Sequence, residues 1–268
     1  MMLSGLYVPL ITPFAADGSV ALAALEQLAH DVLDGGATGL VALGTTAEPS
    51  ALSPAEQSAV LELLGRVSRE RSAQLIAGGP VTPESATAAL TLVPPFVRPG
   101  EDGVVAYLAS VARRSPVPLV VYHVPYRTAQ PLSAGALRRI AALPGVAGIK
   151  LAAGGIDAEV IALMADPPPG FAILGGDDVV ISPLLALGAH GGILASAHLE
   201  TRAYASLMSS WEPGLGHRLA RLSAALFAEP NPAVIKAVLH THGRIPTPDV
   251  RLPLLPAARE SLAAVPVP

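Results

Sequence analysis

The sequence contains no cysteine. This absence excludes disulfide bonds, zinc–thiolate centres, iron–sulfur clusters and thiol nucleophiles. The seven histidines do not recur with carboxylates at a spacing typical of metal ligands, so we also predict no metal site. The chemistry of this chain is therefore expected to depend on hydroxyl, amine, guanidinium or carboxyl groups.

Charged residues are scarce: they make up 14% of the 268 residues, and the net charge is -4. A typical globular protein has about a quarter. No basic run is present that would contact phosphate backbones, so we predict no nucleic-acid partner. Hydrophobic residues make up 51%. We therefore expect a large core, and some apolar surface buried between subunits.

The sequence also lacks a targeting or membrane signal. Its first residues, MMLSGLYVPLITPF, have neither the basic start nor the cleavage site of a signal peptide. Residues 179–197 contain no Asp, Glu, Lys or Arg, but Pro183 and three glycines interrupt them. This stretch favours a short buried helix followed by a buried strand. We therefore expect a cytoplasmic protein with no membrane partner.

Short apolar runs recur along the chain, each followed by small or polar residues before a helical pattern begins. Their continuous apolarity is typical of strands covered on both faces, as in a parallel sheet surrounded by helices. Eight such strands predict an α/β fold, a (β/α)8 TIM barrel. The runs are residues 6–12, 39–44, 75–78, 90–93, 119–122, 147–150, 171–174 and 192–195.

The segments between these runs predict helices, with one exception. Residues 22–33 are amphipathic, and Ser53, Pro54 and Glu56 have the pattern of a capping box at a helix start. Only residues 79–89 separate the third and fourth runs, which leaves room for little more than a turn or two of helix and predicts a thinner outer wall. We expect residues 1–199 to form the barrel, with residues 200–268 as a C-terminal helical extension packed on it in one structural unit.

Reactive side chains gather where the predicted strands end, which is where barrel enzymes carry their chemistry. Thr45 and Thr46 follow the second strand and could hold a small anion through hydroxyl and backbone N–H groups, or could simply cap the turn. Tyr122 ends the fifth strand and could transfer protons, and Arg127 could bind a carboxylate. The alternatives are a core tyrosine and a surface arginine.

Two adjacent acids, Asp177 and Asp178, follow the seventh strand. Carboxylates in this position could act as acid or base groups. They are also favoured residues for the start of a helix, where a side-chain oxygen accepts from a backbone N–H. We expect one of the two to cap the next helix.

Lys150 ends the sixth strand among apolar residues, and Lys236 is the only other lysine beside fifteen arginines. Arginine supplies positive charge as well as lysine does, but it cannot form an imine with a ketone. Burial disfavours the charged form of an amine and so exposes the nucleophile. Lys150 therefore indicates covalent chemistry, and the alternative is a lysine that reaches solvent from a strand end.

Several motifs together resemble the dihydrodipicolinate synthase / N-acetylneuraminate lyase family over nearly the whole chain. The resemblance implies a class I pyruvate-dependent aldolase, a lyase on a (β/α)8 barrel that assembles as a homodimer or homotetramer. It implies no cofactor other than the covalent lysine imine. The motifs are GTTAE at 44–48, YHVPYRT at 122–128, GIK at 148–150, GGDD at 175–178, EPNP at 229–232 and RLPLLP at 251–256.

The resemblance also implies roles for individual residues. Lys150 would form a Schiff base with pyruvate or another 2-oxo acid, Tyr122 would be the general acid and base, and Thr45 would pass protons to that tyrosine. The resemblance implies substrate-binding positions at Thr46, Arg127, Ala47, Gly175 and Ile193.

The sequence departs from the family pattern at several positions. Ala47 stands where the synthases usually have glycine, His123 where they have asparagine, and Leu151 where they have glutamate. Phe96 aligns with a tyrosine that enters a neighbouring subunit's site, and it has no hydroxyl to donate. Pro54 and Gln57 stand where lysine-inhibited synthases tend to have histidine. We therefore expect imine chemistry without feedback control by lysine.

These departures favour an aldolase that cleaves a 2-oxo-3-deoxy or 4-hydroxy-2-oxo acid to pyruvate and an aldehyde. One alternative is a dihydrodipicolinate synthase proper, which condenses pyruvate with aspartate semialdehyde. Another is a barrel that binds a 2-oxo acid without turning it over. The choice of aldehyde is expected to depend on residues near the mouth, for which the candidates are His123, Tyr126, Ser196 and His198.

Overall fold

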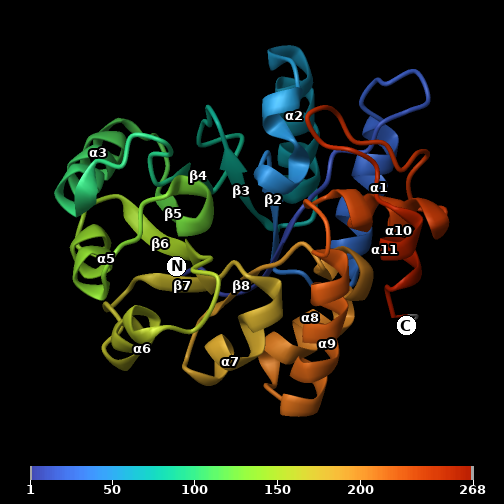
Figure 1. Cartoon of the computed structure of the whole chain (residues 1–268). Coiled ribbons are helices and arrows are strands. Elements are labelled where there is room, and N and C mark those ends of the chain that lie inside the picture. Colours follow the sequence, from blue (N-terminus) through green and yellow to red (C-terminus); the bar gives the residue numbers. More distant parts are fainter. Residues whose placement is uncertain (1, 267–268) are drawn as a thin grey trace.

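A computed structural model describes residues 2–266 of the chain. Eight parallel strands pair in chain order, and β8 returns to β1 to close a barrel (Figure 1). The predicted (β/α)8 TIM barrel is therefore confirmed. The strands are β1 Gly5–Pro9, β2 Gly39–Ala42, β3 Gln74–Gly78, β4 Ala88–Leu92, β5 Leu119–His123, β6 Val146–Leu151, β7 Ala172–Gly175 and β8 Gly191–Ile193.

Helices surround the sheet, with α3, α5 and α6 on one side and α1 and α8 to α11 on the other (Figure 1). Three short 3-10 turns lie between them: η1 Thr45–Ala47, η2 Pro49–Ala51 and η3 Asp178–Val180. The helices are α1 Leu22–Asp34, α2 Pro54–Glu70, α3 Gly100–Arg114, α4 Pro125–Thr128, α5 Ala134–Ala141, α6 Ala158–Ala165, α7 Ile181–Ala186, α8 Ala197–Ser209, α9 Pro213–Leu226, α10 Ala233–Thr241 and α11 Arg259–Ala263.

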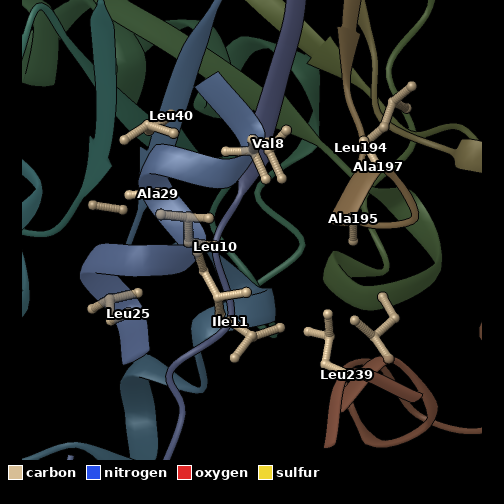
Figure 2. Packing of buried hydrophobic residues seen from close by; sticks show 14 of the residues in the cluster. Val8, Leu10, Ile11, Leu25, Ala29, Leu40, Leu194, Ala195, Ala197 and Leu239 are labelled. Carbon is tan, nitrogen blue, oxygen red and sulfur yellow. The ribbon is translucent and has the colours of Figure 1, made fainter. Parts of the chain in front are cut away.

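The apolar side chains form separate layers inside and outside the barrel. Tyr7, Ile76 and Leu174 belong to a buried cluster contributed by the strands. A larger cluster joins the strands to the surrounding helices, and Figure 2 shows Val8 and Leu40 within it, close to α1. Both faces of the strands are thus covered by apolar atoms, which explains why the sequence shows continuous rather than alternating apolar runs.

The start of α2 has the predicted capping box. The Ser53 hydroxyl accepts a hydrogen bond from the Glu56 backbone N–H, and a Glu56 carboxylate oxygen accepts one from the Ser53 backbone N–H at 2.8 Å. Arg251 donates to both Glu56 oxygens, at 2.8 and 2.6 Å, and this lowers the Glu56 pKa to about 2. The C-terminal extension thus contacts the helix that follows the second strand.

The connection from β3 to β4 contains no helix in residues 79–87, where the chain forms only turns and bends. The outer wall is thinner there, as the short connection predicted. Small side chains suit this arrangement, because Ala86 packs into the cluster below α2 and Ala89 packs against Val117. The flanking helices can therefore cover this part of the sheet.

The predicted division between residues 199 and 200 falls inside α8, which begins at Ala197. This helix packs against β1 and completes the outer ring, so the extension proper begins after it, with α9. Within residues 2–266 no helix combines the length and apolarity that a membrane crossing would require.

Candidate active site

A cavity of about 350 Å³ opens at the carboxyl ends of the strands. Its walls come from several strand ends and from residues that precede α10 in the chain. Six of the predicted site residues border this cavity: Thr45, Thr46, Tyr122, Arg127, Lys150 and Ile193.

Lys150 is 6% exposed and lies on β6, directly opposite Tyr122 on β5. Its Nζ is 4.3 Å from the centroid of the Tyr122 ring. No carboxylate forms an ion pair with this amine within residues 2–266. Gly176 provides space for the lysine chain, because a Cβ at that position would lie 2.7 Å from Lys150 Cγ. Lys150 is therefore a buried amine held beside an aromatic ring at the edge of the cavity.

The Tyr122 side chain is 5% exposed and borders the same cavity as Lys150. Thr45 borders it as well, but no hydrogen bond joins Thr45 and Tyr122 in the part of the chain that the structure describes. A phenol beside a buried amine can donate or accept protons at atoms bonded to that amine.

The turn η1 places two threonines at the cavity. The first N–H groups of such a turn have no acceptor within it and so can face an anion. The Thr46 hydroxyl accepts from Asn231 Nδ2 at 2.9 Å, and the Thr12 hydroxyl donates to the Ala47 carbonyl at 2.8 Å. The turn is therefore held from two directions, and it can present polar groups to a carboxylate.

The residue after this turn, Glu48, is buried and has a left-handed backbone conformation with φ of 55°. Its Oε1 accepts from Lys236 Nζ at 2.7 Å, and its Oε2 accepts from the Arg251 backbone N–H at 2.7 Å. Lys236 is fully buried and also donates to the Asp249 carbonyl at 2.6 Å. Burial lowers the Lys236 pKa to about 8. The second lysine is thus a structural residue that ties α10 to the threonine turn.

The expectation that Asp177 or Asp178 caps the next helix is wrong. Asp177 accepts from the Gly154 backbone N–H and Asp178 from that of Ser196, both at 2.6 Å, and neither side chain bonds to α7. Both acids border the cavity instead. Burial raises the Asp178 pKa to about 6, although hydrogen bonding from Ser196 and, to a smaller extent, the nearby Lys150 charge oppose the shift. The two adjacent acids at the end of the seventh predicted strand were the sequence feature that indicated carboxyl groups at this cavity.

Gly175 and Ala47 do not reach the cavity. A Cβ at Gly175 would lie 2.5 Å from Ile181 Cδ1, so this position faces α7. Gly176, one residue later, borders the cavity instead because successive residues of a strand face opposite sides. Ala47 is the last residue of the threonine turn η1, and it is 2% exposed. Neither Gly175 nor Ala47 borders the cavity, so their roles as substrate contacts stay predictions.

The four candidate specificity residues do not all lie at the same cavity. Tyr126 lies at the rim of the cavity, with the Arg127 guanidinium 5.5 Å from its ring centroid. His198 is fully buried and accepts from the Ile11 backbone N–H. Ser196 is buried behind the site, and its backbone N–H donates to Asp178 as described above. His123 borders a different cavity.

Asn231 borders the cavity, whereas Phe96 lies away from it. Asn231, the only asparagine of the sequence, borders the cavity, and its Oδ1 is buried without a partner in residues 2–266. The EPNP motif was the signal for it. Phe96 does not border the cavity: it is 88% exposed, with φ of 71°, on the loop between β4 and α3.

Comparison with known proteins identifies the family. A model of the dihydrodipicolinate synthetase family matches residues 2–267. The chain belongs to this family. The 4-hydroxy-tetrahydrodipicolinate synthase of Neisseria meningitidis serogroup B is 31% identical to it, over 98% of this chain and 97% of that one. That of Sorangium cellulosum is 36% identical, over 95% and 91%.

Solved structures agree with this family. The chloride-inhibited dihydrodipicolinate synthase of Acinetobacter baumannii, complexed with pyruvate, matches with a TM-score of 0.90 at 31% identity and covers 98% of this chain and 97% of that one. Family members are pyruvate-dependent aldolases. The chain is therefore an enzyme, a lyase of the class I aldolase type.

Proposed function

We propose that Lys150 forms an imine with the keto carbon of pyruvate or another 2-oxo acid, and that the derived enamine makes or breaks a carbon–carbon bond. The observation that carries this proposal is the placement of a buried amine without a carboxylate partner in residues 2–266, beside Tyr122 at a cavity. An amine that borders a cavity and is not held in an ion pair can approach and add to a keto carbon bound there.

The proposed reaction balances without an external oxidant or reductant. The free amine adds to the keto carbon, and loss of one water gives a protonated imine. The imine withdraws electrons from the adjacent methyl carbon, so loss of a proton there gives an enamine. That carbon then bonds to an aldehyde carbon, and the aldehyde oxygen takes up a proton. Addition of water to the imine releases the product and restores Lys150, and the reverse order describes cleavage.

The surrounding residues suit these steps. Tyr122 is the proposed general acid and base, because it borders the cavity beside the amine. Thr46 and its backbone neighbours would bind the carboxylate of the 2-oxo acid, with Thr45 as a proton donor to Tyr122. Arg127, exposed at the rim, would bind a carboxylate of the second substrate.

The names of the relatives favour one reaction within this class. Curated relatives from Neisseria, Synechococcus and Sorangium are 4-hydroxy-tetrahydrodipicolinate synthases, 31 to 36% identical over most of both chains. The second candidate is therefore condensation of pyruvate with aspartate semialdehyde. The absence of a hydroxyl at Phe96 weighs against it and favours cleavage of a 4-hydroxy-2-oxo acid.

Borohydride trapping tests the imine. The protein is incubated with pyruvate, reduced and digested, and the peptides are weighed by mass spectrometry. We expect a carboxyethyl adduct on the peptide that contains Lys150 and none on the peptide that contains Lys236, which serves as an internal control. Lys150→Arg keeps a positive charge but should give no adduct. An unmodified Lys150 peptide in the wild type would disprove the proposal.

A pair of assays separates the two reactions. Consumption of pyruvate with aspartate semialdehyde measures condensation, and pyruvate release from 4-hydroxy-2-oxo acids measures cleavage. Condensation that is abolished by Lys150→Ala would establish the synthase. Cleavage that exceeds condensation in kcat/KM would establish the aldolase.

A further inference from the structure

Asn231 reaches the active-site cavity from the loop that precedes α10. It stands between the two prolines of the EPNP motif, which restrict the backbone on both sides of it. Its Nδ2 donates to the Thr46 hydroxyl at 2.9 Å, although the two residues are 185 positions apart in the chain. Further along the same segment, Lys236 donates to Glu48. The segment therefore contacts the threonine turn at two points, which together fix where the Asn231 amide lies.

The hydrogen bond from Asn231 limits what the Thr46 hydroxyl can offer to a ligand. A hydroxyl has one hydrogen to donate and two lone pairs that can accept. The Asn231 N–H occupies one lone pair, so the hydroxyl hydrogen has to point elsewhere. It has no acceptor within residues 2–266. Because Thr46 is 3% exposed and borders the cavity, the cavity is where this hydrogen can find an acceptor.

The other end of the Asn231 amide has no hydrogen bond. Its Oδ1 is buried without a partner in the part of the chain that the structure describes. A buried polar atom without a partner costs stability, so an asparagine that served stability alone would be expected to pair both ends of its amide. The hydrogen bond that this amide does make is to a hydroxyl in the cavity wall. This combination favours a functional reason for an amide at this position.

We propose that Asn231 is a positioning residue, which holds the Thr46 hydroxyl so that its hydrogen faces the carboxylate of the bound 2-oxo acid. This inference rests on the proposed imine chemistry. A carboxylate only accepts hydrogen bonds, so a hydroxyl that donates to it is favourable and one that presents a lone pair is not. Hydrogen bonds to a charged group are also stronger than those between neutral groups. Asn231 thus acts on the affinity for the substrate carboxylate and not on the reactivity of Lys150.

The test compares pyruvate with hydroxyacetone, a ketone that has no carboxylate. The full chain is incubated with either ketone and with cyanoborohydride, which reduces imines but spares ketones, and the adduct on the Lys150 peptide is quantified by mass spectrometry. We expect Asn231→Ala to raise the half-saturating pyruvate concentration about tenfold and to change the hydroxyacetone rate less than about twofold. The retained hydroxyacetone reaction also shows that the variant is folded. A purely structural role would weaken both reactions equally.

A double variant shows whether the effect passes through the hydroxyl. Thr46→Val keeps the shape of the side chain and removes the hydroxyl, so in this background Asn231→Ala should raise the half-saturating pyruvate concentration by less than about twofold more. Gln27→Ala removes an exposed amide from α1 and is the matched control, which should change neither reaction.

Three results would overturn the proposal alone: an unchanged half-saturating pyruvate concentration in Asn231→Ala, equal losses with both ketones, or the same loss with and without the Thr46 hydroxyl. A wild-type protein with no adduct at Lys150 would instead overturn the imine, and with it this inference. The failure of the positioning role and the failure of the imine are therefore distinguishable.

Discussion

Substitution by methionine should affect the two lysines differently: Lys236→Met should lower the free energy of unfolding, whereas Lys150→Met should abolish the imine. Lys236→Met removes the amine that donates to Glu48 and leaves that carboxylate buried, with the Arg251 backbone N–H as its only remaining donor in residues 2–266. Removing one partner of a buried ion pair costs about 3 to 5 kcal/mol of unfolding free energy. Domains of ordinary stability have about 5 to 15 kcal/mol in total, so this change is large.

Lys150→Met should cost much less. Lys150 has no ion-pair partner in residues 2–266, so methionine removes a buried amine without breaking an ion pair, and it withdraws only the longer-range attraction of that charge for Asp177 and Asp178. Its unbranched side chain fills a similar volume. We expect a change within about 1 kcal/mol, or a gain in stability, because an unpaired buried polar group is itself costly. The same variant should lose the borohydride adduct completely, whereas folded Lys236→Met should keep it.

A double variant provides the control for the lysine comparison. Glu48→Gln combined with Lys236→Met removes both charges, and the glutamine oxygen can still accept from the Arg251 N–H. Because burial lowers the Lys236 pKa to about 8, the pair carries a desolvation cost that the double variant no longer has. It should therefore be more stable than Lys236→Met alone. Denaturant midpoints measure all three variants. Equal losses for Lys150→Met and Lys236→Met, or a double variant that is no more stable than Lys236→Met, would refute the reasoning.

Three further changes have expected outcomes. Asn231→Ala removes the donor to the Thr46 hydroxyl and should raise the KM for pyruvate about tenfold with little change in Tm. Asp178 has a folded pKa raised to about 6, so its stabilising contribution is present below pH 3.8 and lost as pH rises through 6; Asp178→Asn should therefore gain up to about 3 kcal/mol on the wild type between pH 4 and 7 in thermal unfolding. His198 has a folded pKa lowered to about 4, so wild-type stability should fall by up to about 3 kcal/mol as pH falls from 6.5 to 4, and His198→Gln should flatten that slope.

The sequence predicted the barrel because each strand is covered on both faces and so appears as a continuous apolar run. It also singled out Lys150, by its place at the end of a predicted strand, but it gave no role to Lys236. Lys236 has apolar neighbours along the chain, and the carboxylate that pairs with it lies 188 residues away, on Glu48. The structural role of Lys236 therefore depends on a tertiary contact that the sequence pattern does not show.

Contacts between distant segments also explain the other misplaced residues. Aspartate is a favoured residue type at helix starts, but the Asp178 carboxylate accepts a hydrogen bond from the Ser196 backbone N–H at the barrel mouth instead. Gly175 and Gly176 are identical in the sequence, and the end of β7 decides which one faces the cavity. A shift of one residue at a strand end reverses the side, and such ends are the least certain part of a prediction.

The contacts of α10 form late, because this helix is synthesised after all eight strands. All eight strands are present once the ribosome has added Ile193, so the sheet can close before the chain is finished. The donors that hold the threonine turn, Asn231 and Lys236, come about forty residues later. A chain released between these points would have all eight strands but would lack the donors that hold the threonine turn. Activity in this enzyme is therefore expected to appear only with the last helices, after the fold itself.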